Sequence, residues 1–125
     1  MLLITSRETR RWVIPKGWAE KGVAPHEQAA REAFEEAGLK GEIGLKPIGS
    51  YRYLKRLQNG QTAPCRVDVY PLTVEHRLDD WPEKGQREAV WLTLGEAAAL
   101  VDEQGLVTLL LDLAAAGPRS AKPIA

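Results

Sequence analysis

A cluster of glutamates is the strongest chemical signal in the sequence. Glu32, Glu35 and Glu36 follow one another at helical spacing, which places all three on one side of a helix. Like charges this close repel one another, and the neighbouring Arg31 can offset only part of that repulsion. A set of oxygen ligands favours Mg²⁺ or Mn²⁺ over zinc or copper. The pattern therefore indicates a divalent-metal site, with a solvated acidic face as the alternative interpretation.

A helix with defined ends must carry this cluster. Pro25 suits the first helical position because its missing N–H would be unpaired there in any case. Gly38 predicts a left-handed stop directly after Ala37. The opposite side of the helix is apolar and predicts contact with a core; it comprises Ala29, Ala30, Ala33, Phe34 and Ala37. We therefore expect a helix over residues 25–37, entered from a loop over residues 15–24.

The other segments predict a mixture of strands and helices. Alternating and apolar runs predict strands over residues 1–5, 12–14, 42–57, 66–76 and 89–92, with a hairpin turn at 58–61. Helices are expected from 93 or 94 to 102 and over 106–115, and an acidic loop over 78–86. We expect one domain over residues 1–116. A flexible tail is expected over 117–125, where two prolines stand among few apolar residues.

Composition excludes several classes of protein. The chain has 125 residues, 44% of them hydrophobic, which is enough for one domain with a core. Cys65 is the only cysteine, so the sequence has neither an internal disulfide nor a zinc site built from cysteines. The apolar runs are too short for a membrane span, and the start does not resemble a signal peptide. We therefore expect a cytoplasmic protein with no membrane partner.

The charge balance indicates a small ligand. The 17 basic and 17 acidic residues cancel, whereas a general nucleic-acid binder is usually basic overall. Basic residues nevertheless outnumber acidic ones between residues 40 and 66. This local excess favours a small anionic ligand and no stable nucleic-acid partner, with a solvated face as the alternative.

The glutamate helix and the loop before it resemble the signature of the Nudix hydrolases. That signature reads Gly, five residues, Glu, seven residues, then Arg-Glu-aliphatic-any-Glu-Glu-any-Gly-aliphatic. Gly17 opens it here, and residues 31–39 close it in register. Eight of the nine specified positions match if Ala33 is accepted as the apolar one. The exception is Val23, which replaces the first glutamate of the signature.

The resemblance implies a fold as well as a reaction. We expect an α+β protein, a Nudix-type α/β/α sandwich with a mixed β-sheet. Members of the family usually have a further strand before the one expected at residues 2–4. Its absence would leave an exposed sheet edge, and a homodimer through that edge is a hypothesis.

The resemblance also assigns roles to the charged residues. Glu35 and Glu36 correspond to metal ligands, and Glu32 to a further ligand or the base. The backbone carbonyl of Lys16, beside Gly17, corresponds to another ligand. Arg31 would orient the carboxylates, and because Val23 cannot hold it, Glu20 or Glu27 is expected to do so. Glu88 is a candidate extra ligand or general base, with an ordinary surface glutamate as the alternative.

The implied reaction is Mg²⁺-dependent hydrolysis of phosphoanhydride bonds in substrates of the nucleoside diphosphate-X type. The chain is most similar to the diadenosine and diphosphoinositol polyphosphate phosphohydrolases, on the strength of Ser6-Arg7, Arg10-Arg11-Trp12 and Trp91-Leu92. The candidate substrate-binding residues are Arg10, Arg11, Lys16, Trp18, Lys21, Arg52, Lys55 and Arg56.

Two alternatives remain open from the sequence. One is a pyrophosphatase for nucleoside triphosphates or for nucleotide sugars and ADP-ribose. The other is a non-catalytic module that binds a nucleotide and regulates a partner. Such a module would be expected to lose its metal ligands, whereas Glu32, Glu35 and Glu36 are all present.

Overall fold

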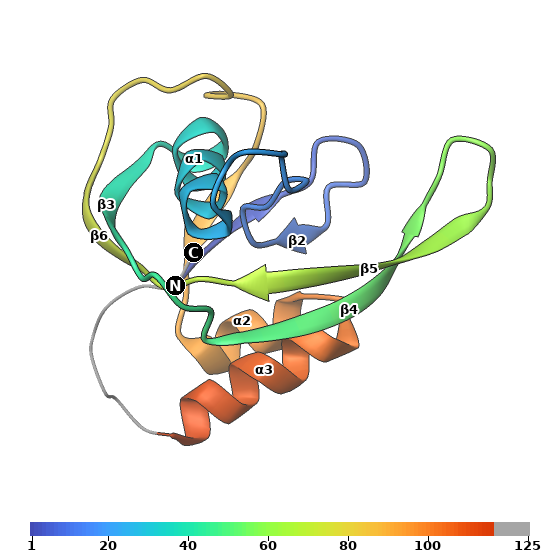
Figure 1. Ribbon diagram of the computed structural model, residues 1–125. Coiled ribbons are helices and arrows are strands. Elements are labelled where there is room, and N and C mark those ends of the chain that lie inside the picture. Colours follow the sequence, from blue (N-terminus) through green and yellow to red (C-terminus); the bar gives the residue numbers. More distant parts are fainter. Residues whose placement is uncertain (117–125) are drawn as a thin grey trace.

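A computed structural model describes residues 1–116, so the flexible tail expected over 117–125 lies outside the described residues. The elements follow one another as β1 (Leu2–Thr5), β2 (Trp12–Val13), α1 (Pro25–Ala37), β3 (Leu39–Ile43), β4 (Gly49–Arg56), β5 (Thr62–Val69), β6 (Leu72–Arg77), β7 (Ala89–Trp91), α2 (Leu94–Leu100) and α3 (Gln104–Ala115) (Figure 1). The α+β class expected from the sequence is confirmed. None of these three helices has the length and apolar character that a bilayer crossing requires.

The strands form three small sheets. Within residues 1–116 their orders are β2-β1-β7, β3-β6 and β4-β5, and every pair is antiparallel. The resemblance led us to expect a mixed sheet, whereas all the strand pairs within the described residues are antiparallel. β1 has a partner on both sides, so the exposed edge expected at this strand is not found along it.

Two of the expected strands are each divided in two. The run over residues 42–57 is interrupted between β3 and β4, where Gly44 and Pro47 stand. The run over 66–76 is interrupted at Tyr70 and Pro71. A proline has no N–H to donate to a neighbouring strand, and Pro71 instead accepts a hydrogen bond from the N–H of Gly44 (2.8 Å). Alternation of apolar residues predicted the strands but did not reveal these breaks.

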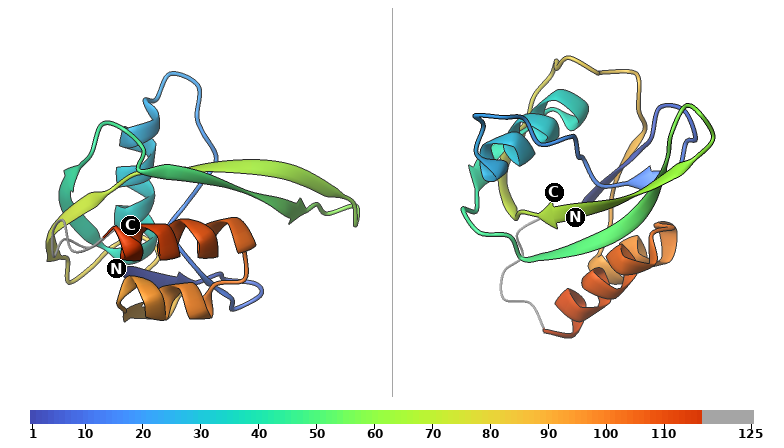
Figure 2. Two further views of the ribbon diagram at one scale, coloured as in Figure 1. Left: turned by 90° about the horizontal axis from the view of Figure 1, so that it is seen from below. Right: turned by 45° about the vertical axis from the view of Figure 1, so that its right-hand side comes forward.

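The core lies on both faces of β1. Leu2 and Ile4 pack toward α1 with Ala33, Ala37 and Leu39. Leu3 points the other way, because successive side chains of a strand alternate in direction, and it joins the residues of α2 and α3. The helices therefore lie on opposite sides of the strands, as expected for an α/β/α arrangement (Figures 1 and 2).

The boundaries of α1 agree with the sequence prediction. Pro25 begins the helix, and Gly38 ends it in the left-handed region with φ of 69°. The N–H of Gly38 donates to the carbonyl of Phe34 (2.9 Å). Gly38 also lies against the ring of Trp81 so closely that a Cβ atom would overlap that ring. Two separate requirements therefore select glycine at this position.

The β4–β5 hairpin extends away from the rest of the molecule as a long two-stranded ribbon (Figure 2). The N–H of Leu57 donates to the carbonyl of Gln61 (2.8 Å), which closes the expected turn, and Gly60 adopts a φ of 82° within it. The inner part of the ribbon forms one wall of the site described below.

Replacing Gly38 by alanine should destabilise the protein more than the same change at Gly22. Both glycines have positive φ, but a Cβ at Gly22 meets nothing within 4 Å. Gly22→Ala should cost about 1 kcal/mol for the backbone alone. Gly38→Ala should cost about 1–3 kcal/mol more, because the Trp81 ring must move. Urea denaturation of both variants measures the difference, and equal losses would show that Trp81 moves without cost.

Candidate active site

A cleft of about 410 Å³ lies between α1, the loop over residues 15–24 and the inner part of the β4–β5 ribbon. Several residues selected from the sequence line it, namely Lys16, Gly17, Trp18, Glu32, Glu36 and Lys55. The structure therefore brings together two of the three clustered glutamates, the signature glycine and three candidate substrate-binding residues.

Glu36 is the most buried carboxylate of the helix, with 8% of its surface exposed. One oxygen, Oε1, accepts a hydrogen bond from the backbone N–H of Lys16 (3.1 Å), and Oε2 lies 3.6 Å from Nη2 of Arg87. Burial raises the pKa of Glu36 to about 8; Arg87 opposes that rise, and Glu32 adds to it. The nearby cation thus compensates only partly for burying this carboxylate beside a second one.

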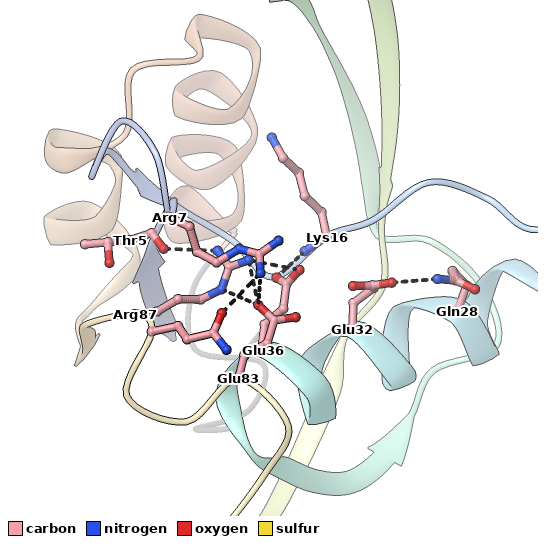
Figure 3. A network of polar contacts seen from close by, with 9 residues as sticks. Thr5, Arg7, Lys16, Gln28, Glu32, Glu36, Glu83 and Arg87 are labelled. Carbon is pink, nitrogen blue, oxygen red and sulfur yellow. Dashed lines mark hydrogen bonds and ion pairs between the residues drawn. The ribbon is translucent and has the colours of Figure 1, made fainter.

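Arg87 anchors a network of charges beside Glu36 (Figure 3). Its Nη2 lies 2.9 Å from Oε1 of Glu83, and its Nη1 donates to the carbonyl of Thr5 (3.1 Å). Nη1 of Arg7 lies 3.8 Å from the same oxygen of Glu83. The Arg87 side chain is only 10% exposed, so its charge is poorly screened by water.

Sequence reasoning missed Arg87 and Glu83. Both lie in the segment between β6 and β7, which resembles an ordinary acidic loop. Their four-residue separation and the scarcity of basic residues in that loop were the available signals. Neither signal reveals that the loop packs against α1.

Glu32 lies against the glycine that opens the signature. Nε2 of Gln28, one turn earlier in α1, donates to Oε1 of Glu32 (2.7 Å). On the other side, a Cβ atom added to Gly17 would overlap the Glu32 carboxylate. Glycine therefore leaves the Glu32 carboxylate room to lie against the backbone of the loop, and a larger residue would displace it.

Arg31 is held from the preceding loop, as the substitution at position 23 led us to expect. Of the two acidic residues considered, Glu20 supplies the partner, with Oε2 lying 3.0 Å from Nη1 of Arg31. The side chains are 43% and 57% exposed, so the pair contributes little to stability. Its effect is to connect the loop with the outer side of α1.

Two other predicted catalytic residues do not line the cleft. Glu35 is half-buried, and its backbone carbonyl accepts from the N–H of Glu83 (3.0 Å). Glu88 is exposed, and its backbone N–H and carbonyl are both hydrogen-bonded to Thr5. Those bonds fix the end of the acidic loop against β1, and they leave the Glu88 side chain at the surface.

The alternation of β4 divides the predicted substrate-binding residues between two faces. Tyr53 and Lys55 line the cleft, whereas Arg52 and Arg56 are exposed and do not. This follows from the period of two in a strand. Arg10, Arg11 and Lys21 are also outside the cleft lining; the side chain of Arg11 lies 4.0 Å from Asp102.

Two lysines stand over aromatic rings in the cleft. Nζ of Lys16 is 4.1 Å from the centroid of Tyr53, and Nζ of Lys55 is 4.2 Å from that of Trp18. Lys16 also lies 3.8 Å from Oε1 of Glu103. Burial lowers the pKa of Lys16, and the Glu103 carboxylate acts in the opposite direction. The ring of Tyr53 therefore stabilises the Lys16 ammonium. Trp18 keeps 62% of its surface exposed.

The residues present fit a divalent cation with a largely aqueous shell. Residues 1–116 contain no preformed group of three acidic, histidine or cysteine side chains arranged for a metal. Mg²⁺ does not require one, because it commonly binds one or two carboxylates and keeps several waters. Glu32 and Glu36 would supply carboxylate oxygens, and the backbone of Lys16 reaches Glu36 through its N–H. Burial and the neighbouring Glu32 raise the pKa of Glu36 despite Arg87, so a cation at this carboxylate would offset an incompletely compensated charge.

Comparisons with known proteins give a family match and several relatives. A family model described as NUDIX domain matches residues 1–111. Nudix hydrolase 12, mitochondrial, from Arabidopsis thaliana is 35% identical over 103 residues, which are 80% of this chain and 51% of that protein. Human diphosphoinositol polyphosphate phosphohydrolase 3-alpha is 34% identical over 99 residues, 78% of this chain and 56% of that protein. The chain thus spans about half the length of these curated relatives.

A solved structure of similar fold is a C. elegans Ap4A hydrolase binary complex. Its TM-score is 0.64 at 21% identity, and the match covers 91% of this chain and 82% of that one. At this identity the similarity concerns the fold. The family model and the sequence relatives confirm the resemblance drawn from the signature, including the similarity to the diphosphoinositol polyphosphate phosphohydrolases.

Arg87→Met should strongly destabilise the protein. It leaves the buried carboxylate of Glu36 without its cation and the half-buried Glu83 with only Arg7, at 3.8 Å, and breaking a buried pair costs about 3–5 kcal/mol. The matched control is Arg66→Met, because Arg66 pairs with Asp68 at 3.0 Å but is 62% exposed; it should cost less than about 1 kcal/mol. Urea denaturation in metal-free buffer at about pH 9, above the pKa of about 8 for Glu36, compares the two, and similar small losses would contradict the network.

Proposed function

The chain belongs to the NUDIX domain family, and from that premise we propose that it hydrolyses phosphoanhydride bonds in substrates of the nucleoside diphosphate-X type. The observation that carries the proposal is the cleft in which Glu32 and Glu36 face the loop containing Gly17. Mg²⁺ is the proposed cofactor and Mn²⁺ the alternative, since both accept oxygen ligands.

The proposed substrates are diadenosine polyphosphates or diphosphoinositol polyphosphates. Relatives named diphosphoinositol polyphosphate phosphohydrolase support this choice. Cations and aromatic rings that share one cleft also support it, because Lys16, Lys55 and Trp18 could contact phosphates and a base. A pyrophosphatase for other nucleotides and a non-catalytic nucleotide-binding module are the alternatives that the substrate panel below tests.

Glu36 and the carbonyl of Lys16 are the proposed metal-holding groups within the cleft, and Glu32 is proposed either as a further ligand or as the general base. Glu35, outside the lining, is proposed as a ligand on the signature alone. A bound Mg²⁺ ion supplies charge neutralisation on the phosphates and a more acidic water. Arg31 acts at a distance, because its pair with Glu20 fixes the loop that carries the Lys16 carbonyl.

Glu32 is the proposed general base. Its Oε1 is held by Gln28, which leaves Oε2 to accept a proton from the attacking water. Glu88 is the alternative, and its exposed side chain outside the cleft favours Glu32. Arg87 keeps Glu36 oriented toward the cleft through the contact between Nη2 and Oε2.

The compartment and the assembly state are also proposals. The single cysteine favours a reducing compartment such as the cytoplasm, although the Arabidopsis relatives are named as mitochondrial. A homodimer through an edge of the β2-β1-β7 sheet would involve β2 or β7, since β1 is paired on both sides. Light scattering over a range of concentrations tests the dimer, and a constant monomer mass would exclude it.

Glu36→Gln should lower turnover by at least about 100-fold, because loss of a ligand should exceed the effect of losing a group that only orients one. Ion-exchange chromatography would follow products from diadenosine tetraphosphate, a diphosphoinositol polyphosphate, ATP and ADP-ribose in the presence of Mg²⁺. The control is Glu42→Gln, which removes an exposed carboxylate on β3 and should retain full activity.

The substrate panel separates the three functions. Cleavage of the first two substrates by the wild type alone would support the proposal. Cleavage restricted to ATP or ADP-ribose would transfer the assignment to the other pyrophosphatases. Near-wild-type activity of Glu36→Gln would contradict the metal site, and binding without any cleavage would favour the regulatory module.

Mg²⁺ should stabilise the wild type and stabilise Gly17→Ala less. An ion that binds only the folded state at ten times its Kd contributes about 1.4 kcal/mol. The added Cβ of Gly17→Ala displaces the Glu32 carboxylate, so the rise in melting temperature with Mg²⁺ should shrink. Gly95→Ala is the control, because a Cβ there meets nothing within 4 Å. Equal Mg²⁺ effects in both variants would exclude Glu32 from the metal site.

A further inference from the structure

Glu103 is a buried carboxylate without a structural explanation. Its side chain is 5% exposed, and within residues 1–116 its Oε1 has no hydrogen-bond partner. It occupies the position before α3, yet its side chain does not cap that helix. A buried charged oxygen without a hydrogen bond destabilises a fold. The only charged partner found for it among these residues is Lys16, at 3.8 Å.

The Lys16–Glu103 pair alters the charge of the cleft. Five cationic side chains line that cleft, namely Arg7, Lys16, Lys55, Arg66 and Arg87. Four of these have a carboxylate within 4.0 Å in the described part of the chain. Lys55 is the exception, and its ammonium lies over the Trp18 ring instead. The cleft is therefore much less positive than its number of cations suggests.

The degree of burial decides which of these pairs persist when a phosphate arrives. The Arg66–Asp68 and Arg7–Glu83 pairs each contain an arginine more than half exposed, so water screens them and a phosphate can replace the carboxylate. Arg87 is paired with the carboxylates of Glu36 and Glu83. Lys16 is 25% exposed and its partner 5%, so water screens this pair little and the Glu103 carboxylate offsets the positive charge of Lys16.

We propose that Glu103 is a specificity-determining residue, which acts through Lys16 to limit how much negative charge the cleft accepts. This inference rests on the proposed function, and it predicts which of the two proposed substrate classes the cleft prefers. A densely phosphorylated inositol ring requires many free cations. A dinucleoside polyphosphate requires fewer and offers a base that can stack on the exposed face of Trp18. The cleft of this chain therefore favours the dinucleoside polyphosphate.

Glu103→Gln tests the proposal because it removes the charge and keeps the shape. We expect kcat/KM for a diphosphoinositol polyphosphate to rise relative to diadenosine tetraphosphate by on the order of tenfold. The change should appear in KM, with kcat within about twofold, because Lys16 would bind phosphate more tightly without altering the reacting groups. Asp112→Asn, the same charge change at an exposed position of α3, should leave the ratio unchanged.

A double-mutant cycle establishes that Lys16 transmits the effect. In a Lys16→Met background, Glu103→Gln should no longer change the substrate ratio, since the ammonium it neutralised is absent. A shift of the same size in that background would overturn the proposed route. Glu103→Leu provides a second variant, because it removes the charge with an apolar side chain of similar size; it should give the same shift in substrate ratio as Glu103→Gln.

Stability separates this role from a structural one. Because Oε1 of Glu103 has no hydrogen bond to lose, the melting temperature should fall only by the loss of its 3.8 Å ion pair with Lys16, and the Lys16→Met/Glu103→Leu double variant, which removes both charges, should recover that loss. A lower melting temperature with an unchanged substrate ratio would show that Glu103 serves the fold, and would overturn the proposal.

Binding measurements keep the test independent of turnover. Calorimetry with inositol hexakisphosphate and with diadenosine tetraphosphate, in Ca²⁺ and in the Glu36→Gln background, should show the same relative gain for the inositol ligand when Glu103 is neutralised. If the wild type cleaves neither substrate class, the proposed function fails, while these affinities still decide the role of Glu103. Equal affinities before and after substitution would overturn it.

Discussion

Burial of the Glu36 carboxylate is the constraint on which the rest of the site depends. The oxygens of this carboxylate contact two other segments of the chain besides its own helix. Oε1 receives the N–H of Lys16 from the loop before α1, and Oε2 faces Arg87 from the loop before β7. Arg87 in turn donates to the carbonyl of Thr5 at the end of β1. One desolvated charge thus joins parts of the chain that are distant in sequence.

The same constraint leaves the site short of positive charge. Two carboxylates approach each other beside Gly17, and burial raises the pKa of Glu36 to about 8 even with Arg87 at hand. A divalent cation would relieve both the repulsion and the desolvation, so folding around the cleft and binding of the ion are coupled. A fully neutralised cluster would be more stable without metal and would have less to gain from it. The incomplete compensation is therefore compatible with a site built to bind an ion.

The features predicted correctly from the sequence are those that interactions between neighbouring residues determine. The spacing of Glu32 and Glu36, the start of α1 at Pro25 and its end at Gly38 all follow from contacts within a few residues. The side of β4 on which Arg52 lies depends on which face of the ribbon meets the cleft, and a charge excess in the sequence carries no such information. Arg87 was missed for a related reason, because its partners belong to other elements. What remained unpredicted is the pairing of distant segments.

Lys16 shows how this fold can separate metal binding from substrate choice. Its backbone N–H is committed to Glu36, which any residue except proline could provide. Its side chain extends away toward Tyr53 and Glu103, where identity and charge matter. A change at position 103 can therefore alter the electrostatics felt by a polyphosphate while the hydrogen bond that shapes the metal site is unaffected. In the proposed mechanism, one buried carboxylate directly before α3 adjusts specificity at a distance from the groups proposed for hydrolysis.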